Sequence, residues 1–355
     1  MEKGKKVFVG MSGGVDSSVT AALLKKEGYD VTGVFIKVWS PDWLPCTWKD
    51  ERRDAMRVAA HLDIPFFTFD FENEYKKAVA DYMIDEYKKG RTPNPDVMCN
   101  KEIKFGSFLK KALEMGADYI ATGHYVQNID TTLIEGVDTN KDQSYFLWTI
   151  PTEDLTSVLF PIGSFQKSEV RALATKFNLP TASKKDSQGL CFIGKVEMKE
   201  FLKHYIESNP GNVVNEKGEI IGIHEGAVFY TIGQRHGYSL TKKSATDTPY
   251  YIVKKDIDAN TLTVSQKLEE DSLKTIKRII LSEVNIRGES IDVTKKYGAR
   301  IRYRQGKQFC TITKDENNNF EIEFDIPQQG VSLGQSVVIY SGLVCLGGGI
   351  IKKVR

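Results

Sequence analysis

The sequence has 355 residues, which is enough for two or three domains with sizeable hydrophobic cores. Its 49 lysines and arginines nearly balance its 47 aspartates and glutamates, so net charge neither indicates nor excludes a nucleic-acid partner. No apolar run approaches the roughly 18 residues of a membrane helix, so we expect a cytoplasmic protein with no membrane partner.

The first predicted element is a buried β-strand at residues 7–9, which runs into the turn Gly10-Met-Ser-Gly-Gly-Val-Asp-Ser17 and an apolar segment with helical spacing. A strand, a glycine turn and a helix N-terminus together predict an anion site, because the first helix amides lack intrahelical acceptors and the helix dipole is positive there. The turn has no lysine, which excludes a Walker loop, and serine at position 12 excludes a dinucleotide fingerprint. An ordinary tight turn is the alternative interpretation.

The segment Ser12-Gly-Gly-Val-Asp-Ser17 resembles the pyrophosphate loop (PP-loop) of the ATP pyrophosphatases, which split ATP between the α and β phosphates and adenylate a carbonyl oxygen. The resemblance implies that ATP is the cofactor. The expected ATP-binding residues are Gly10, Met11, Ser12, Gly13, Gly14, Val15, Asp16, Ser17, Ile36 and Gly123.

Further along the N-terminal half, predicted strands alternate with predicted helices. The strands are expected at residues 31–38, 66–71 and 118–122, and the helices at 50–62, 75–89, 105–115 and 169–177. This alternation predicts an α/β fold with a parallel sheet, whose ligand lies at the carboxyl ends of the strands. Ile36, Gly123 and His124 are at or just beyond such ends.

Residues 91–105 form a polar loop in which two prolines flank Asn94, so we expect a stiff, extended recognition element. Cys99 is predicted at or just before the next helix and near Lys101, where helix amides and a cation would lower the pKa of a thiol and make it a nucleophile. Asp96 is close enough to transfer a proton. The alternative for Cys99 is a small buried hydrophobic residue.

Cys191 lies in a polar, glycine-rich segment that we predict to be a loop. The five cysteines are scattered without a C-x-x-C pair, so we expect neither a zinc site nor a disulfide scaffold. Cys99 and Cys191 could meet only through the fold. Because a reducing cytoplasm disfavours a structural disulfide, a redox-active or sulfur-carrying pair fits them better.

Several motifs together resemble those of the tRNA-specific 2-thiouridylases, from one end of the chain to the other. Besides the PP-loop they are Asn94-Pro-Asp-Val-Met-Cys99, Ala121-Thr-Gly-His-Tyr125, Lys141-Asp-Gln-Ser-Tyr145, Ser187-Gln-Gly-Leu-Cys191, Gly233-Gln-Arg-His-Gly237 and Cys345-Leu-Gly-Gly-Gly-Ile-Ile351. Members of this family replace O2 of the wobble uridine of certain tRNAs with sulfur.

The resemblance implies a mechanism. ATP, expected with Mg²⁺ although no carboxylate cluster identifies a protein metal site, adenylates O2 of a uridine that is flipped out of the anticodon loop. Cys191 would carry the sulfur as a persulfide, loaded by a donor such as a cysteine desulfurase or a sulfur-relay protein. Cys99 would release hydrosulfide from the persulfide or form a transient Cys99–Cys191 disulfide. Asp96 would transfer the proton and contact the base.

From about residue 209 the pattern changes to short strands without intervening helices, which predicts two small β-rich domains. The resemblance implies that the last of them is a β-barrel that binds tRNA. The predicted division is 1–208, 209–275 and 276–355. Period-two spacing places Arg300, Arg302 and Arg304 on one face of a strand, where they suit a phosphate backbone or form a solvated face. Gly233-Gln-Arg-His-Gly237 is either a phosphate-contacting turn or a solvated loop.

By family position, the expected tRNA contacts are Asn94, Pro95, Asp96, His124, Lys141, Asp142, Gln143, Arg302, Tyr303 and Gln335. Two alternatives stay open at this point. One is another PP-loop enzyme, such as a 4-thiouridine, lysidine or amide synthetase, and the other is a non-catalytic RNA-binding protein. Intact loop serines, Asp16 and both cysteines argue against the second.

Overall fold

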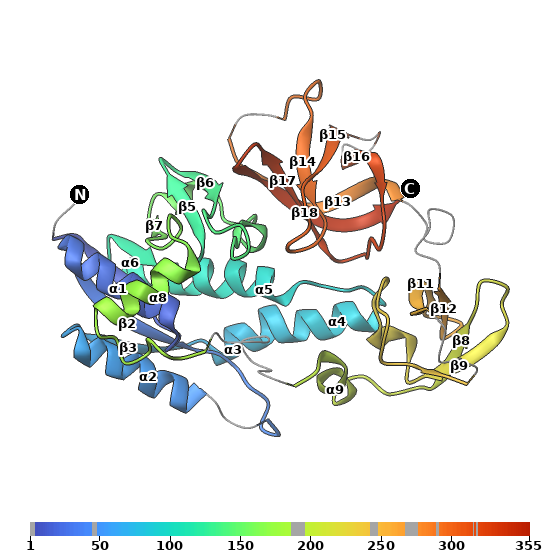
Figure 1. Ribbon diagram of the computed structural model, residues 1–355, viewed down its shortest axis with the longest axis horizontal. Helices are drawn as coiled ribbons and strands as arrows, with labels where there is room; N and C mark the ends of the chain where they lie inside the picture. The colour runs from blue at the N-terminus through green and yellow to red at the C-terminus, as the bar shows by residue number, and fades with distance from the viewer. Residues whose placement is uncertain are drawn as a thin grey trace.

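The computed structural model describes residues 4–44, 48–185, 196–241, 248–266, 276–288, 291–314, 316 and 319–355. Figure 1 shows a domain built on a parallel sheet at one end, a small β domain at the other, and a β-barrel above the helices between them. Within the described ranges, no helix is both long enough and apolar enough to cross a membrane.

The N-terminal sheet confirms the predicted α/β fold. Its strands are β1 (Lys6–Gly10), β2 (Asp30–Lys37), β3 (Phe66–Asp70), β4 (Tyr119–Ala121) and β7 (Val158–Leu159), in the order β3-β2-β1-β4-β7 and with every pairing parallel. The strand order reverses between β1 and β4, so a ligand crevice is expected beyond their carboxyl ends. Gly10 and Thr122 open the two loops that border this crevice.

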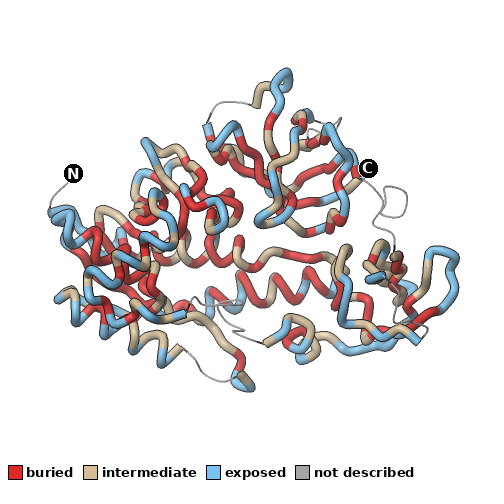
Figure 2. The backbone as a smooth tube through the Cα atoms, in the orientation of Figure 1, coloured by how far each residue is buried: buried red, intermediate tan, exposed pale blue. Residues whose placement is uncertain are grey.

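Helices cover both faces of the sheet, and the side chains of β1 alternate between them. Val7 and Val9 pack in one core cluster with residues of α1 (Val15–Glu27) and α8 (Lys167–Lys176). Phe8 packs in a second cluster with residues of two long helical runs. The first run comprises α3 (Glu72–Tyr75), η1 (Lys76–Asp81) and α4 (Tyr82–Lys88), and the second comprises α5 (Pro95–Met98), η2 (Cys99–Ser107) and α6 (Phe108–Glu114). Figure 2 shows buried residues along α4 and α5 in the middle of the molecule.

The helix that contains Cys99 begins earlier than predicted. Asn94 is its N-cap, with Oδ1 accepting a hydrogen bond from the Val97 amide at 3.3 Å, and Pro95 occupies the first helical position. Both residue types are favoured at these places. Cys99 is therefore the fifth helical residue and the first of a π-helical segment, so the prediction that it stands at the helix start was wrong. Its amide bonds to carbonyls within the helix.

A hairpin that the sequence analysis did not predict links the N-terminal domain to the barrel. Strands β5 (Val126–Ile129) and β6 (Thr132–Glu135) are joined by Asp130 and Thr131, both in the left-handed region with φ of 47° and 63°. Two positive φ values are typical of the tight hairpin turn that matches strand twist. Ile134 of β6 pairs with Val344 of the last barrel strand.

The C-terminal half is β-rich, as predicted. After α9 (Met198–Lys203), the strands β8 (Gly211–Val214), β9 (Ile220–His224), β10 (Ser239–Leu240), β11 (Tyr251–Asp256) and β12 (Thr261–Ser265) form a sheet in the order β10-β9-β8-β12-β11. Next come β13 (Ile276–Ile286), β14 (Tyr297–Arg300), β15 (Gln308–Lys314), β16 (Phe320–Gln328), β17 (Ser336–Ser341) and β18 (Val344–Val354). Pairing of β13 with both β16 and β18 closes these strands into a barrel, which confirms the prediction for this part. Helices α2 (Trp48–His61) and α7 (Thr152–Leu155) complete the N-terminal domain.

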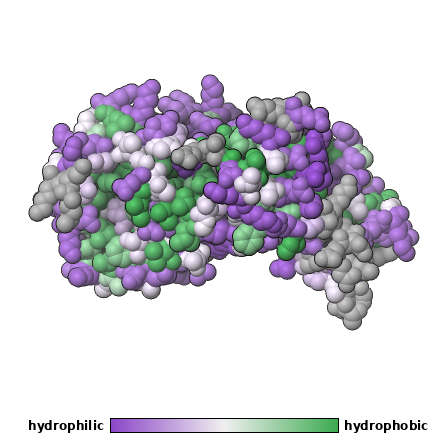
Figure 3. All heavy atoms as spheres, turned by 90° about the horizontal axis from the view of Figure 1, so that it is seen from above, coloured by the Kyte–Doolittle hydropathy of each residue, from purple (hydrophilic) through white to green (hydrophobic). Residues whose placement is uncertain are grey.

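Figure 3 shows the face that carries the barrel and the hairpin. Hydrophilic residues cover most of its rim, and hydrophobic residues gather on the half that lies over the N-terminal domain.

Candidate active site

The PP-loop, residues 10–17, is shaped by its own serines. The Ser17 hydroxyl accepts from the Ser12 amide at 3.2 Å, and both Ser17 and Ser18 donate their hydroxyls to the Gly14 carbonyl, at 3.2 and 2.7 Å. Gly14 is the N-cap of α1 and supplies no side-chain oxygen to the first helix amides. The geometry therefore suits an exogenous anion at this helix end.

Two glycines of the site are required by space or by backbone conformation. Gly13 has a φ of 71°, and a Cβ there would lie 2.3 Å from the Glu51 carbonyl oxygen. Gly123 packs against the start of α1, where a Cβ would lie 2.8 Å from the Ser17 amide nitrogen. Gly123 thus brings the end of β4 into contact with the PP-loop, as expected for the two strands that border the crevice.

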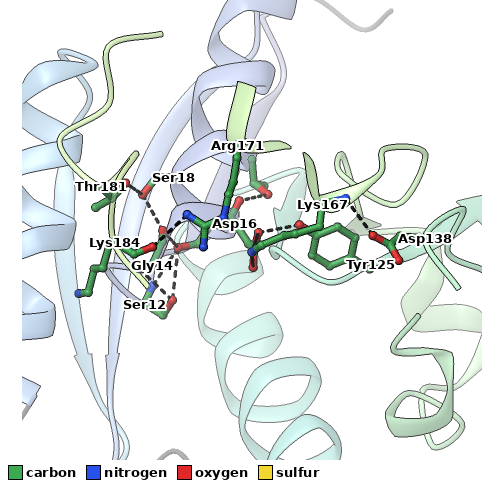
Figure 4. Close-up of polar contacts among 12 residues, drawn as sticks. Ser12, Gly14, Asp16, Ser18, Tyr125, Asp138, Lys167, Arg171, Thr181 and Lys184 are labelled. Atoms are coloured by element: carbon green, nitrogen blue, oxygen red, sulfur yellow. Dashed lines mark hydrogen bonds and ion pairs between the residues drawn. The ribbon is translucent and has the colours of Figure 1, made fainter. Parts of the chain in front are cut away.

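Asp16 is the centre of a network that reaches three later segments (Figure 4). Its carboxylate accepts hydrogen bonds from the Tyr125 hydroxyl at 2.7 Å and from Lys167 Nζ at 2.7 and 2.9 Å. The Tyr125 carbonyl in turn accepts from the Gln143 amide at 3.0 Å, and the Tyr125 amide donates to Gln143 Oε1 at 3.0 Å. The Lys167 amide donates to Asp138 at 2.9 Å, which fixes the start of α8 beside the loop.

The chain beyond α8 lies beside the PP-loop, as Figure 4 also shows, and we call residues 181–185 the strap. Thr181 donates its hydroxyl to Ser18 at 3.0 Å. Lys184 Nζ donates to the Gly13 carbonyl at 3.0 Å and to Asp54 at 2.7 Å. Arg171 donates to the Lys184 carbonyl at 3.1 Å. Residues 181–185 are therefore anchored to the same loop that would hold a nucleotide phosphate.

A second set of candidate residues lies on the proline loop, residues 91–98, and the helix that follows. Burial raises the pKa of the Asp96 carboxyl, and the nearby positive charge of Lys104 opposes that rise. Cys99 is buried, with 3% of its surface exposed, among the apolar residues of the larger core cluster. Lys101, expected to be the cation beside the thiol, instead faces outward and pairs with Glu102 and Glu283 at 3.4 and 3.6 Å, so that prediction was wrong.

His124 lies between the PP-loop residues and the residues of the proline loop and its helix. It follows Gly123, its ring lies 5.8 Å from the Phe105 ring of η2, and Nδ1 lies 2.8 Å from the Thr122 hydroxyl. Burial, assisted by the charge of Lys104, holds the pKa of His124 well below 6.5, so the imidazole is neutral at physiological pH. The same lysine acts on Asp96 and on His124. The side chain expected to contact tRNA is therefore buried between the nucleotide loop and the Asp96 helix.

The predicted row of three arginines does not exist. Strand β14 ends at Arg300, and Arg304 has a φ of 63°, so the period-two geometry stops after Arg300. Arg300 is turned toward the hairpin and forms ion pairs with Glu135 and Asp142, each at 2.8 Å. Arg302 donates to the Ile232 and Gly330 carbonyls.

The remaining predicted tRNA contacts are divided between the surface and the interior. Asp142 is buried and also accepts from the Gly136 and Ser144 amides at 3.1 Å, so its carboxylate is not presented to solvent. Lys141 precedes it in a turn and is partly exposed. Tyr303 reaches across to the N-terminal domain, where its ring centroid lies 4.5 Å from that of Phe146.

Family models match the chain in three consecutive stretches. They are described as a tRNA methyl transferase HUP domain at residues 5–195, a tRNA methyl transferase PRC-barrel domain at 199–266 and an aminomethyltransferase beta-barrel domain at 276–351. The tRNA-specific 2-thiouridylase MnmA of Pseudomonas entomophila is 46% identical, with 99% of this chain and 95% of that protein covered. The MnmA of Staphylococcus carnosus is 45% identical, with 98% and 95% covered. The chain belongs to the tRNA-specific 2-thiouridylase family.

Among solved structures, the U34-tRNA thiolase NcsA from Methanococcus maripaludis is 18% identical to this 2-thiouridylase family member, with a TM-score of 0.37 and coverage of 54% of this chain and 61% of that chain.

For this family member, sequence reasoning missed residues that act on the site from a distance. Lys167 and Tyr125 lie 151 and 109 residues from Asp16, and nothing local to them signals that partner. Lys104 could have been found, because it follows Cys99 by one turn of a π-helix. Cys191, and with it the predicted Cys99–Cys191 pairing, lies outside the described residues. In the part of the chain that the structure describes, no cluster of three or more His, Cys, Asp or Glu side chains could hold a metal.

Proposed function

We propose that this chain is a tRNA-uridine 2-sulfurtransferase that uses ATP to replace O2 of the wobble uridine of tRNA with sulfur. One observation carries the proposal beyond family membership. Gly123 contacts the PP-loop and the adjoining His124 contacts the helical run of Asp96 and Cys99, which supports a nucleotide site next to an acid–thiol site. Activation of O2 by ATP and attack of sulfur on the adjoining C2 need this proximity.

In the first step, O2 of the uracil attacks the α-phosphorus of ATP, an O–P bond forms and pyrophosphate leaves. We propose that the residues predicted from the PP-loop hold the phosphates, with the amides of α1 and the hydroxyl of Ser12 facing them. Lys167 holds Asp16 in place and adds positive charge beside the loop. Mg²⁺ would arrive on the triphosphate, and no step below depends on it.

In the second step, the terminal sulfur of a persulfide on Cys191 attacks C2, and AMP leaves. The Cys99 thiolate then attacks the Sγ atom of Cys191, the persulfide S–S bond breaks, and sulfur remains on C2. A Cys99–Cys191 disulfide results, and an external thiol must reduce it before the next cycle. Asp96 is proposed to exchange the base proton, and its raised pKa suits a carboxyl that must be protonated in part of the cycle.

For tRNA, we propose contacts through Asn94, Pro95, Asp96, Lys141, Gln143, Arg302 and Tyr303, with His124 and Asp142 supporting the site from the interior. The proposed domains are 1–208, 209–275 and 276–355, and a cysteine desulfurase or sulfur-relay protein is the proposed donor. The proposed location is the cytoplasm.

The test is to incubate the purified chain with ATP, a persulfide donor and unmodified tRNA, and then to digest the tRNA for mass spectrometry. We expect 2-thiouridine at the wobble position together with AMP and pyrophosphate. ADP in place of AMP would contradict the role of the PP-loop. Because the family models are named after a methyl transferase, a parallel reaction contains S-adenosylmethionine, and a methylated uridine without 2-thiouridine would overturn the proposal.

A further inference from the structure

Thr92, on the proline loop of the N-terminal domain, is hydrogen-bonded to both of the other domains. Its amide donates to the Leu333 carbonyl of the barrel at 2.8 Å, and its carbonyl accepts from Gln335 Nε2 at 3.0 Å. Its hydroxyl lies 3.2 Å from the Thr231 hydroxyl of the central β domain. Only 8% of the Thr92 surface is exposed. Every polar group of this residue therefore has a partner in another domain.

The barrel side of this junction is itself fixed. The Gln335 carbonyl accepts from the Ile351 amide of β18 at 2.8 Å, and the Gly334 amide donates to the Ile351 carbonyl at 3.0 Å. Gly334 has a φ of 89°, and a Cβ there would lie 3.1 Å from the Thr92 carbonyl oxygen. The barrel backbone and the proline loop thus approach as closely as a glycine permits.

The proline loop links the position of Thr92 to the positions of Asp96 and Cys99. On one side of Thr92, Arg91 is tied to the carboxylate of Glu86 by two N–H donors, and its amide donates to the Glu86 carbonyl at 2.9 Å. On the other side, Pro93 and Pro95 flank the helix cap Asn94 and restrict the backbone. A shift of Thr92 would therefore move the start of α5, and with it Asp96 and Cys99.

We propose that Gln335 is a positioning residue that sets the placement of Asp96 and Cys99 through the Thr92 backbone, with Thr231 as its partner in the central domain. This assignment rests on the proposed function, and the tRNA contact expected for Gln335 from family position stays a prediction that the Kd for tRNA tests below. The side-chain amide of Gln335 donates to the carbonyls of Thr92 and Pro93, at 3.0 and 3.5 Å.

The experiment compares Gln335→Leu with Gln308→Leu. Gln308 belongs to the same barrel and also donates its side-chain amide to a backbone carbonyl, but that carbonyl belongs to Gly306 of the barrel itself, at 3.1 Å, and not to the proline loop. We expect Gln335→Leu to lower kcat about tenfold while the Kd for tRNA changes less than about twofold, because misplacement acts on the reacting groups. Gln308→Leu is expected to leave both unchanged. Thr231→Val should act in the same direction, and the double variant should lose less than the product of the two single losses, because both act through Thr92.

Two further readouts separate this proposal from the proposed function. Hydrogen exchange of the peptide amides of residues 91–99 should be faster in Gln335→Leu than in wild type or Gln308→Leu, whether or not product forms. The limb of the pH–kcat profile that reports Asp96 should move to lower pH, since a looser site admits water and reduces the burial that raises its pKa. A weaker Kd for tRNA with kcat intact, unchanged exchange at residues 91–99, or an equal loss in Gln308→Leu would each overturn the assignment. If the wild-type protein forms no 2-thiouridine but hydrogen exchange at residues 91–99 is still faster in Gln335→Leu, the proposed function is wrong. The role of Gln335 in positioning the proline loop would then still be supported.

Discussion

The PP-loop and the proline loop are constructed in different ways. The PP-loop takes its shape from bonds among residues three to five positions apart, such as those of Ser17 and Ser18 with Gly14 and Ser12. The proline loop is held by partners 139 and 243 residues away, in two other domains. The turn of the PP-loop can thus be specified by one strand, one turn and one helix, and distant residues such as Lys167 then bond to it. The proposed base and sulfur site takes its place only when the three domains are assembled.

The largest effect is expected at Cys99. Cys99→Ser should abolish 2-thiouridine formation, because a serine hydroxyl cannot attack a persulfide sulfur, while ATP and tRNA still bind. The measurement is product by mass spectrometry with Kd values for both substrates. Cys310→Ala is the matched control, since Cys310 is a buried barrel cysteine, and it should keep activity. Product from Cys99→Ser would remove the thiol from the mechanism.

Asp96→Asn should lower kcat about a hundredfold, as expected for loss of a proton-transfer group. It should also change how stability depends on pH. The pKa of Asp96 in the folded chain lies above 3.8, its value in the unfolded chain. Between the unfolded and the folded pKa the folded chain binds more protons than the unfolded chain, so stability falls as pH rises.

Thermal unfolding at a series of pH values measures whether stability falls as pH rises. Wild type and Asp96→Asn should differ least below pH 3.8, and the variant should gain stability relative to wild type as pH rises through the raised pKa. A constant difference at all pH values would show that Asp96 does not carry this dependence.

At the PP-loop, Asp16→Asn should slow pyrophosphate release about tenfold, because it weakens the attachment of Lys167 beside the phosphates. Tyr125→Phe removes one of the same bonds without changing charge, and a smaller loss is expected from it. Both variants should bind tRNA normally, since the proline loop is untouched. Weaker binding of tRNA by either variant would show that the PP-loop and the proline loop are not independent.

The smallest effect is expected from the strap. Lys184→Met loses the bonds to Gly13 and Asp54 and should raise the KM for ATP about threefold, in proportion to one or two modest hydrogen bonds. Lys185→Met changes an exposed neighbour of the same charge and should have no effect. Equal results for the two lysines would mean that the strap does not influence the loop.

The same contrast explains which features could be predicted from sequence. The strand, turn and helix around Ser12 follow from local patterning, and the parallel sheet follows from alternating elements. The start of α5 was missed even though Asn94 and Pro95 are a recognisable cap and first helical residue. The predicted row of arginines was wrong in part because Arg300 forms ion pairs with Glu135 and Asp142. These partners lie 300 − 135 = 165 and 300 − 142 = 158 residues earlier in the chain. Contacts between residues so far apart in the chain depend on how the domains assemble, and the local hydrophobic periodicity of the sequence does not show this.

The hairpin β5–β6 has a consequence for synthesis of the chain. Ile134 pairs with Val344, so the two partners are 344 − 134 = 210 residues apart. At about 5–20 residues per second, the hairpin leaves the ribosome about 10 to 40 seconds before its partner strand exists. During that interval the outer edge of β6 has no barrel strand beside it, and such edges recruit strands from other chains. The nascent enzyme therefore passes through a period in which its N-terminal domain is complete in sequence but not yet protected from self-association.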